Sequence, residues 1–218
     1  NNSDNMKEIN GLIAQLWYTR DTRSSKPNPL DEVKSLIFYL DILYRNVYDD
    51  LISDPDIMKG SSNFNITFGS WVGADKDGNP YVTTKVTKEA LKIYSNQIIS
   101  IYKEKIIELS DDFSVSTNFV DCPNRLQRRI KNYSILLNKE FDHYSKINFD
   151  EPFRIFLSLV FHRLENFQLN NKGYKSFYEF LEDMEIFQIS VNEVFGKNFR
   201  ISKLDDFVDY VKQFEFHG

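Results

Sequence analysis

The chain has 218 residues, and its 27 basic and 32 acidic side chains give a formal net charge of −5. With 41% hydrophobic and 27% charged residues it has the balance of a globular protein, which excludes a fully disordered or fibrous chain. The acidic balance argues against wholesale binding to nucleic acid or to an anionic membrane surface. The single cysteine, Cys122, excludes an internal disulfide framework and a cysteine-rich zinc site, and a reducing compartment is expected.

No stretch approaches the roughly 20 consecutive apolar residues that a membrane span needs. The first residues lack the basic and apolar regions of a signal peptide, so we expect no leader here. At the other end, residues 214–218 stop abruptly in an alternating apolar pattern. We interpret this as a chain cut inside an element, and therefore expect a segment of a longer protein.

Apolar residues spaced three to four positions apart predict a chain built mainly of helices. Asn28 followed by Pro29 predicts the start of one helix, and Thr87 is expected to cap the next long one. Strands should be few, and we expect them only near Ile66–Trp71 and in the C-terminal tail. The expected helices are 4–18, 29–51, 87–109, 124–145, 151–168, 176–195 and 203–213.

Three further residues set the expected limits of the last two helices. Ser176 with Glu179 has the spacing of a capping box, and Gly196 should end that helix as a C′ glycine. Ser202 should cap the last helix. The basic run from Arg125 to Lys131 is interpreted as a solvated face or a subunit contact, because the chain as a whole is acidic.

Residues 68–83 depart from the helical pattern, since they hold three of the eight glycines and one of the two tryptophans. A calcium loop is suggested by Asp75-x-Asp77-x-Asn79, but Pro80 and Val86 stand where an EF-hand needs glycine and glutamate. A phosphate-binding loop is suggested by the glycines, but neither common phosphate motif is present. The remaining interpretation is a tight structural connection with an Asx-type turn.

A family resemblance bears on this choice. Residues 68–83 read F-G-S-W-V-G-A-D-K-D-G-N-P-Y-V-T and resemble the signature F-G-S-W-x-G-G-D-R-D-G-N-P-x-V-T of the phosphoenolpyruvate carboxylases. Other segments resemble this family in the same order: 16–32 its T-D-E-I-R…P-T-P…D-E segment, 151–164 its E-P-Y-R…R-L helix, 180–184 its F-L-x-D-L helix, and 214–217 its F-G-F-H entry to a barrel strand. The resemblance spans essentially the whole chain.

The resemblance implies a fold and an activity. Members of this family are several times longer, and their fold is a β/α barrel with many additional helices. Residues 1–218 would be a single, mostly helical segment with few short strands and with the signature loop at 68–83. The family carboxylates phosphoenolpyruvate with bicarbonate, giving oxaloacetate and phosphate, and uses Mg²⁺ or Mn²⁺.

The resemblance also implies that the main chemistry lies outside this chain. The family's T-A-H-P-T motif has no counterpart, because no His-Pro pair occurs. Its L-D-x-R-Q motif is expected beyond Gly218, and its metal carboxylates and phosphate loop further downstream. We therefore expect no catalytic residue and no metal ligand within this chain.

Three residues are expected to bind substrate in the longer protein. Trp71 is expected to supply an apolar wall at the methylene carbon of the enolate, although a lone tryptophan is more often a core residue. Lys76 could neutralise charge near phosphate or bicarbonate, or pair with Asp75 or Asp77. Arg23 matches the arginine of the upstream segment and could pair with the same carboxylates or face the active site.

The other residues of the loop are expected to hold its shape: Gly73, Asp75, Asp77, Gly78 and Asn79. The chain departs from the signature at Ala74, where the family has a second glycine, and at Lys76, where it has arginine.

The partners implied by the resemblance are phosphoenolpyruvate and bicarbonate, the rest of the same polypeptide, and further copies, since the family forms tetramers. Neither nucleic acid nor membrane is expected, and the location would be cytoplasmic. A different class stays open: an all-α interaction or regulatory module without catalytic activity, in which the loop is only a structural turn.

Overall fold

The computed structural model describes residues 2–19, 28–48, 50, 71–77, 79–169, 173–196 and 202–216. Every regular element in these ranges is a helix, so the expected mainly α fold is confirmed. None of the helices described is both long and apolar enough to cross a membrane. The residues 66–70 of the expected strand lie outside the described ranges.

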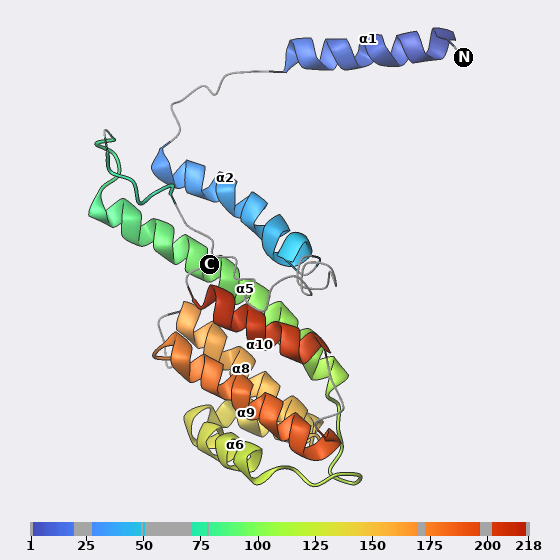
Figure 1. Cartoon of the computed structure of the whole chain (residues 1–218), viewed down its shortest axis with the longest axis vertical. Coiled ribbons are helices and arrows are strands. Elements are labelled where there is room, and N and C mark those ends of the chain that lie inside the picture. The colour runs from blue at the N-terminus through green and yellow to red at the C-terminus, as the bar shows by residue number, and fades with distance from the viewer. Residues whose placement is uncertain are drawn as a thin grey trace, which may run out of the picture.

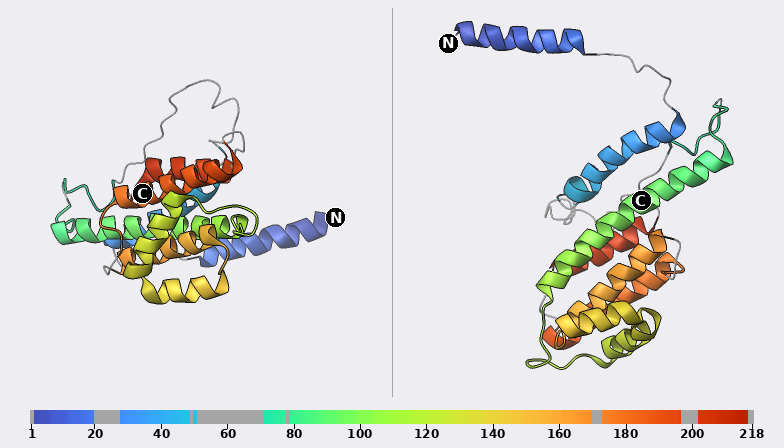
Figure 2. Two further views of the ribbon diagram at one scale, coloured as in Figure 1. Left: turned by 90° about the horizontal axis from the view of Figure 1, so that it is seen from below. Right: turned by 180° about the vertical axis from the view of Figure 1, so that it is seen from behind.

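The first helix, α1 (Asn2–Tyr18), confirms the helix expected over 4–18. It lies apart from the other helices in Figure 1 and in the right-hand view of Figure 2. Its apolar side chains are exposed, up to 82% for Trp17 and 86% for Tyr18. Amphipathic spacing thus predicts the helix correctly, while nothing in the described structure covers its apolar face.

Helix α2 (Pro29–Ile42) begins where Asn28 and Pro29 predict it. The side chain of Asn28 accepts the N–H of Asp31 at 3.0 Å, and the carboxylate of Asp31 accepts the N–H of Asn28 at 3.2 Å. The helix continues into a π-helical turn, η1 (Leu43–Val47). Around this turn, Tyr44 and Tyr48 are buried, so the widened turn anchors the end of α2 in the core.

The longest helix, α5 (Thr84–Asp112), runs through most of the molecule and contacts α2, α8 (Pro152–Gln168) and α10 (Ser202–Phe214) (Figure 1). The expectation that Thr87 caps it is wrong. The hydroxyl oxygen of Thr83 accepts the N–H of Val86 at 3.3 Å, and Thr87 lies inside the first turn. Thr83 takes the capping position because its own backbone is extended, which the helical Thr87 cannot be.

The single helix expected over 124–145 is two helices, α6 (Asn124–Leu136) and α7 (Asn138–Ile147). The chain breaks at Leu137, whose φ and ψ of −126° and 53° are not helical. Leu137 is only 4% exposed. Both short helices pack on α8. Burial against α8 therefore outweighs local helix propensity here.

Helix α9 (Phe177–Phe195) begins and ends as expected, but the prediction of a capping box at its start is wrong. The side chain of Ser176 makes no capping bond, and the carboxylate of Glu179 instead accepts the N–H of Lys175 at 3.1 Å. Gly196 ends the helix with a φ of +83°, which confirms the terminating glycine. Helix α10 includes Ser202, the residue expected to precede it.

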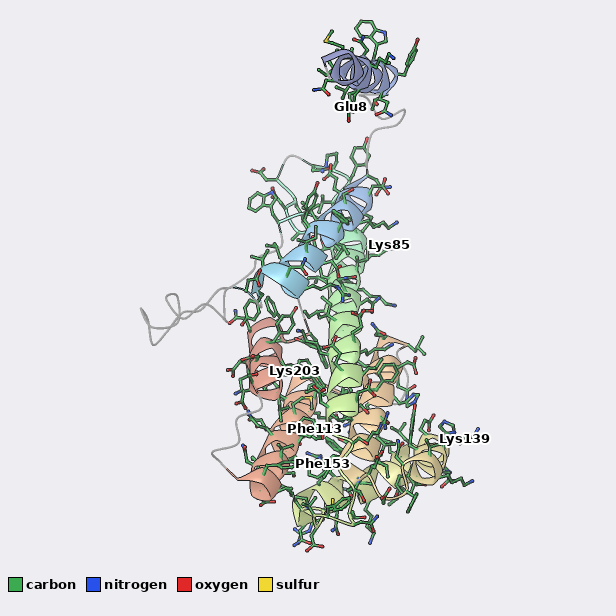
Figure 3. All side chains as sticks on the ribbon, turned by 90° about the vertical axis from the view of Figure 1, so that its right-hand side faces the viewer. Glu8, Lys85, Phe113, Lys139, Phe153 and Lys203 are labelled. Atoms are coloured by element: carbon green, nitrogen blue, oxygen red, sulfur yellow. The ribbon has the colours of Figure 1, made fainter. Side chains whose placement is uncertain are left out.

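Helices α5, α6, α8, α9 and α10 lie together (Figure 2), and they enclose the main hydrophobic core, which is rich in aromatic rings. Figure 3 shows Phe113, just past the end of α5, beside Phe153 of α8. Their rings are stacked at 6.4 Å, and Phe187 of α9 meets both edge-on at 5.1 and 5.8 Å. These rings fix how the ends of three helices meet.

The strand expected in the C-terminal tail is wrong over residues 214–216. Helix α10 runs to Phe214, and Glu215 follows with a φ of +48°. Its N–H still donates to the carbonyl of Val211 at 3.0 Å, which is the bond of a helix-ending left-handed residue. This reversal turns Phe216, 5% exposed, back into the aromatic core beside Phe167 and Phe180.

Candidate functional site

The signature loop leads into α5 and lies beside the start of α2 (Figure 1). Its described residues are 71–77 and 79–83; Gly78, residues 68–70 and Arg23 lie outside the described ranges. The carbonyl of Trp71 accepts the N–H groups of both Ala74 and Asp75 at 3.2 Å. The backbone therefore turns back on itself immediately after the tryptophan.

Gly73 is the position where this turn comes closest to the helices. Its φ is +83°, and it is buried. A Cβ atom at this position would lie 2.6 Å from the Cβ of Ala90 on α5 and 3.2 Å from a methyl carbon of Val33 on α2. Glycine is required twice over, because both the backbone angle and the space exclude a side chain.

Two Asx-type turns follow. The side chain of Asp75 accepts the N–H of Asp77 at 3.0 Å, and that of Asn79 accepts the N–H of Tyr81 at 3.0 Å. Side-chain oxygens thus replace backbone partners in the part of the loop that belongs to no helix. After them, Val82 is buried and Thr83 caps α5.

The larger side chains of the loop point outward. Trp71 is 75% exposed and Tyr81 is 73% exposed, so neither belongs to the hydrophobic core of the described residues. Lys76 is exposed, and no ion pair joins it to Asp75 or Asp77 within the part of the chain described here. The loop therefore exposes an indole ring and an ammonium group, while its backbone at Gly73 packs against α2 and α5.

The described loop does not fit a metal ion. One carboxylate oxygen of Asp75 is engaged with the loop backbone, and over the described ranges no three His, Cys, Asp or Glu side chains converge on one point.

Comparison with known proteins identifies the family. The family model described as phosphoenolpyruvate carboxylase matches residues 1–217. This chain belongs to the phosphoenolpyruvate carboxylase family. A phosphoenolpyruvate carboxylase of Psychromonas ingrahamii is 27% identical over 214 residues, covering 85% of this chain and 24% of that protein.

Two other carboxylases are similar to the chain. One from a Nostoc species is 27% identical over 227 residues, covering 94% of this chain and 22% of that protein. One from Aeromonas salmonicida is 31% identical over 133 residues, covering 57% of this chain and 15% of that protein. The chain therefore spans at most about a quarter of the length of these relatives.

The two departures from the carboxylase signature differ in their structural consequences. Ala74 replaces a glycine without strain, because Gly73 and not Ala74 carries the positive φ of this turn. Lys76 keeps the charge of the family's arginine, but an ammonium group cannot bind an anion through two parallel N–H groups.

The residues that the sequence analysis missed are two charged members of the carboxylase helix motifs, Arg163 of α8 and Asp183 of α9. Asp183 is fully buried, and one carboxylate oxygen accepts the hydroxyls of Tyr133 and Tyr174 at 2.5 and 2.6 Å. A guanidinium nitrogen of Arg163 lies 3.5 Å from the same oxygen. Arg129 places its Nε 3.1 Å from the other oxygen.

This buried ion cluster, defined as Arg129, Tyr133, Arg163, Tyr174 and Asp183, corrects the interpretation of the basic run at Arg129, whereas Arg125, Arg128 and Lys131 are exposed as expected. Arg129 is not part of a solvated face, since its side chain is only 20% exposed and pairs with Asp183. Burial raises the pKa of Asp183 above its usual value, although the tyrosine hydroxyls and both guanidinium groups oppose this. Burial also raises the pKa of Tyr133.

A signal for the cluster was present in the sequence. Asp183 falls on the same helical stripe as Phe180 and Phe187, and Arg163 on that of Val160 and Phe156. A charged residue on an apolar stripe must find a partner of opposite charge when the stripe is buried. The sequence does not say which one, because the two helices meet only in the folded chain.

Proposed function

We propose that this chain forms part of an enzyme that carboxylates phosphoenolpyruvate with bicarbonate to give oxaloacetate and phosphate. The match to the carboxylase family over residues 1–217 supports this activity over a non-catalytic helical module. In such an enzyme, the chain contributes a helical scaffold and one loop of the active site, and the remaining polypeptide contributes the other catalytic groups.

The single observation that carries the role of the loop is the exposed ring of Trp71 on an anchored turn. In this family the reaction passes through carboxyphosphate and the enolate of pyruvate. The methylene carbon of the enolate must meet carbon dioxide before it meets a proton from water. A large apolar face beside that carbon excludes water, so Trp71 favours oxaloacetate over pyruvate.

Lys76 and Arg23 are the cationic groups of this proposal. Lys76 is exposed beside the same turn, where an ammonium group would attract phosphate or bicarbonate. Arg23 lies outside the described residues, and its role rests on the match to the upstream family segment. Mg²⁺ or Mn²⁺ would be held by residues outside this chain, in a cytoplasmic homo-oligomer.

The first test separates the chain from the whole enzyme. The purified 218-residue chain should form no oxaloacetate in an assay coupled to malate dehydrogenase, because it lacks the family's histidine and arginine motifs. The full-length protein should supply oxaloacetate, which malate dehydrogenase reduces with oxidation of NADH, and only with bicarbonate present. Metal-dependent turnover by the isolated chain would contradict this division of labour.

The second test addresses Trp71 in the full-length enzyme. Removing a large aromatic side chain from a pocket costs a few kcal/mol, so Trp71→Ala should slow carboxylation by at least about tenfold. The ratio of pyruvate to oxaloacetate should rise, while the melting temperature should change little because the ring is 75% exposed. Tyr81→Ala, which also removes an exposed ring from the loop, is the matched control and should leave the product ratio unchanged.

A further inference from the structure

Tyr94 of α5 lies directly beneath the turn that carries Trp71. It is 3% exposed, and its hydroxyl donates to the carbonyl of Val72 at 3.4 Å. Ala90 lies one helical turn earlier on α5, where Gly73 packs against it. Two residues on one stripe of α5 therefore contact the two loop residues that follow Trp71.

Among the described residues, nothing comparable supports the tryptophan side chain itself. Its ring is 75% exposed. Only its backbone is held, because the carbonyl of Trp71 accepts the N–H groups of Ala74 and Asp75. The orientation of the indole ring consequently depends on where the Val72–Gly73 backbone is held. The packing at Gly73 limits how closely that backbone approaches α5, and the hydroxyl of Tyr94 limits its rotation.

The presence of tyrosine at position 94 is informative in itself. A phenylalanine ring would fill the same buried space beside Val33 and Ala90 without introducing a polar atom. Burying a hydroxyl group is costly unless it finds a partner, and the carbonyl of Val72 is the partner found here. The hydroxyl therefore serves the loop and not the packing of the helices.

We infer that Tyr94 is a positioning residue for Trp71: its hydroxyl holds the Val72 carbonyl and thereby keeps the exposed indole ring in one orientation. The link from this orientation to carboxylation rests on the proposed function. The link from Tyr94 to the ring does not, and the two are tested separately.

The first experiment uses the 218-residue chain. Trp17→Phe leaves Trp71 as the single indole, and Trp17 is suited to removal because it is 82% exposed on α1. In that background, Tyr94→Phe should increase the amplitude of nanosecond motion of Trp71 in time-resolved fluorescence anisotropy. Tyr178→Phe is the matched control, since it removes a hydroxyl from an exposed tyrosine of α9 and should leave the anisotropy decay unchanged. Circular dichroism verifies that each variant keeps its helices.

An unchanged anisotropy decay in folded Tyr94→Phe would overturn the inference. A larger amplitude that also occurs in Tyr178→Phe would overturn it as well, because the effect would then not come from the loop.

The second experiment uses the full-length enzyme. Tyr94→Phe should raise the ratio of pyruvate to oxaloacetate about two- to tenfold, the effect of losing one hydrogen bond, and Trp71→Ala should raise it further. A ratio that responds to Trp71→Ala but not to Tyr94→Phe would overturn the positioning role. If the ratio responds to neither variant, Trp71 does not form the apolar wall of the proposed function. The anisotropy experiment by itself would then decide whether Tyr94 orients the indole ring.

Discussion

The two halves of α5 lie in regions that are built differently. The C-terminal half packs among α8, α9 and α10 in a core of stacked aromatic rings, beside the buried ion cluster. The first turns of α5 pack against α2 and the signature loop, around the small buried group Val33, Ala90 and Tyr94. The core thus carries most of the stability, whereas the loop keeps its large side chains exposed and relies on a few exact contacts. Substitutions in the two regions should have separable effects.

The largest expected effect is in the core. Asp183→Ala leaves Arg163 and Arg129 without their shared buried carboxylate, and breaking a buried ion pair in this way costs about 3–5 kcal/mol. The free energy of unfolding in urea measures the loss. Glu182→Ala is the control, because it removes the neighbouring carboxylate, which is 60% exposed, and should cost no more than about 1 kcal/mol. Equal losses in both variants would mean that burial of the cluster does not matter.

A smaller effect is expected at the loop. Gly73→Ala forces a side chain into a φ of +83° and to within 2.6 Å of the Cβ of Ala90, so it should cost about 2–3 kcal/mol. Gly196→Ala has the same φ, with a ψ of 153°, and no atom within 4 Å, so it should cost backbone strain alone, about 1–2 kcal/mol. The difference in unfolding free energy between these two variants isolates the contact of the loop with α5. A difference near zero would show that the loop does not pack as described.

The third prediction concerns pH and the edge of the ion cluster. Although partial burial opposes it, the N–H of Lys175 and the guanidinium of Arg163 hold the pKa of Glu179 below its usual value. Because this pKa is lower in the folded chain, the carboxylate stabilises the fold above its unfolded pKa, and that stabilisation is lost as the pH falls through the folded value.

Glu179→Gln should therefore destabilise the chain at pH 7 by up to about 1 kcal/mol, since the carboxylate is partly exposed. The difference in unfolding free energy between the variant and the unmodified chain should disappear below about pH 4, where the glutamate is protonated and is therefore uncharged like glutamine. Urea unfolding at a series of pH values tests this. A gap that stays constant across the series would assign the effect to packing and not to charge.

The smallest expected effect is a gain. Glu215 has a φ of +48°, a conformation that costs a residue with a side chain about 1 kcal/mol or more. Glycine relieves this strain but loses more chain entropy on folding, so Glu215→Gly should stabilise the chain by about 0.5–1 kcal/mol. Glu215→Ala removes the carboxylate and keeps the Cβ atom, so it should give no such gain. A gain with alanine would trace the effect to the charge.

The candidate site was accessible to sequence reasoning only in part. The signature at 68–83 points to Trp71 and to the loop glycines, and the requirement at Gly73 is visible once α2 and α5 enclose it. Tyr94 could not be found in this way, since it lies outside the signature. The role of its hydroxyl becomes visible only in the folded chain, where it donates to the carbonyl of Val72. The convergence of Arg163 and Asp183 was hidden for the same reason.

Signals that act within one or two helical turns were determined by the sequence itself. Asn28 and Pro29 start α2, Gly196 ends α9, and apolar spacing sets the position of most helices, because each depends on neighbours a few residues away. The tertiary structure alone decided the break at Leu137, the failure of the Ser176 cap and the reversal at Glu215. In these places the fold is stabilised by burying an aromatic or aliphatic side chain, or by a guanidinium group from another helix. This stabilisation is larger than the free energy lost when the local preference is given up.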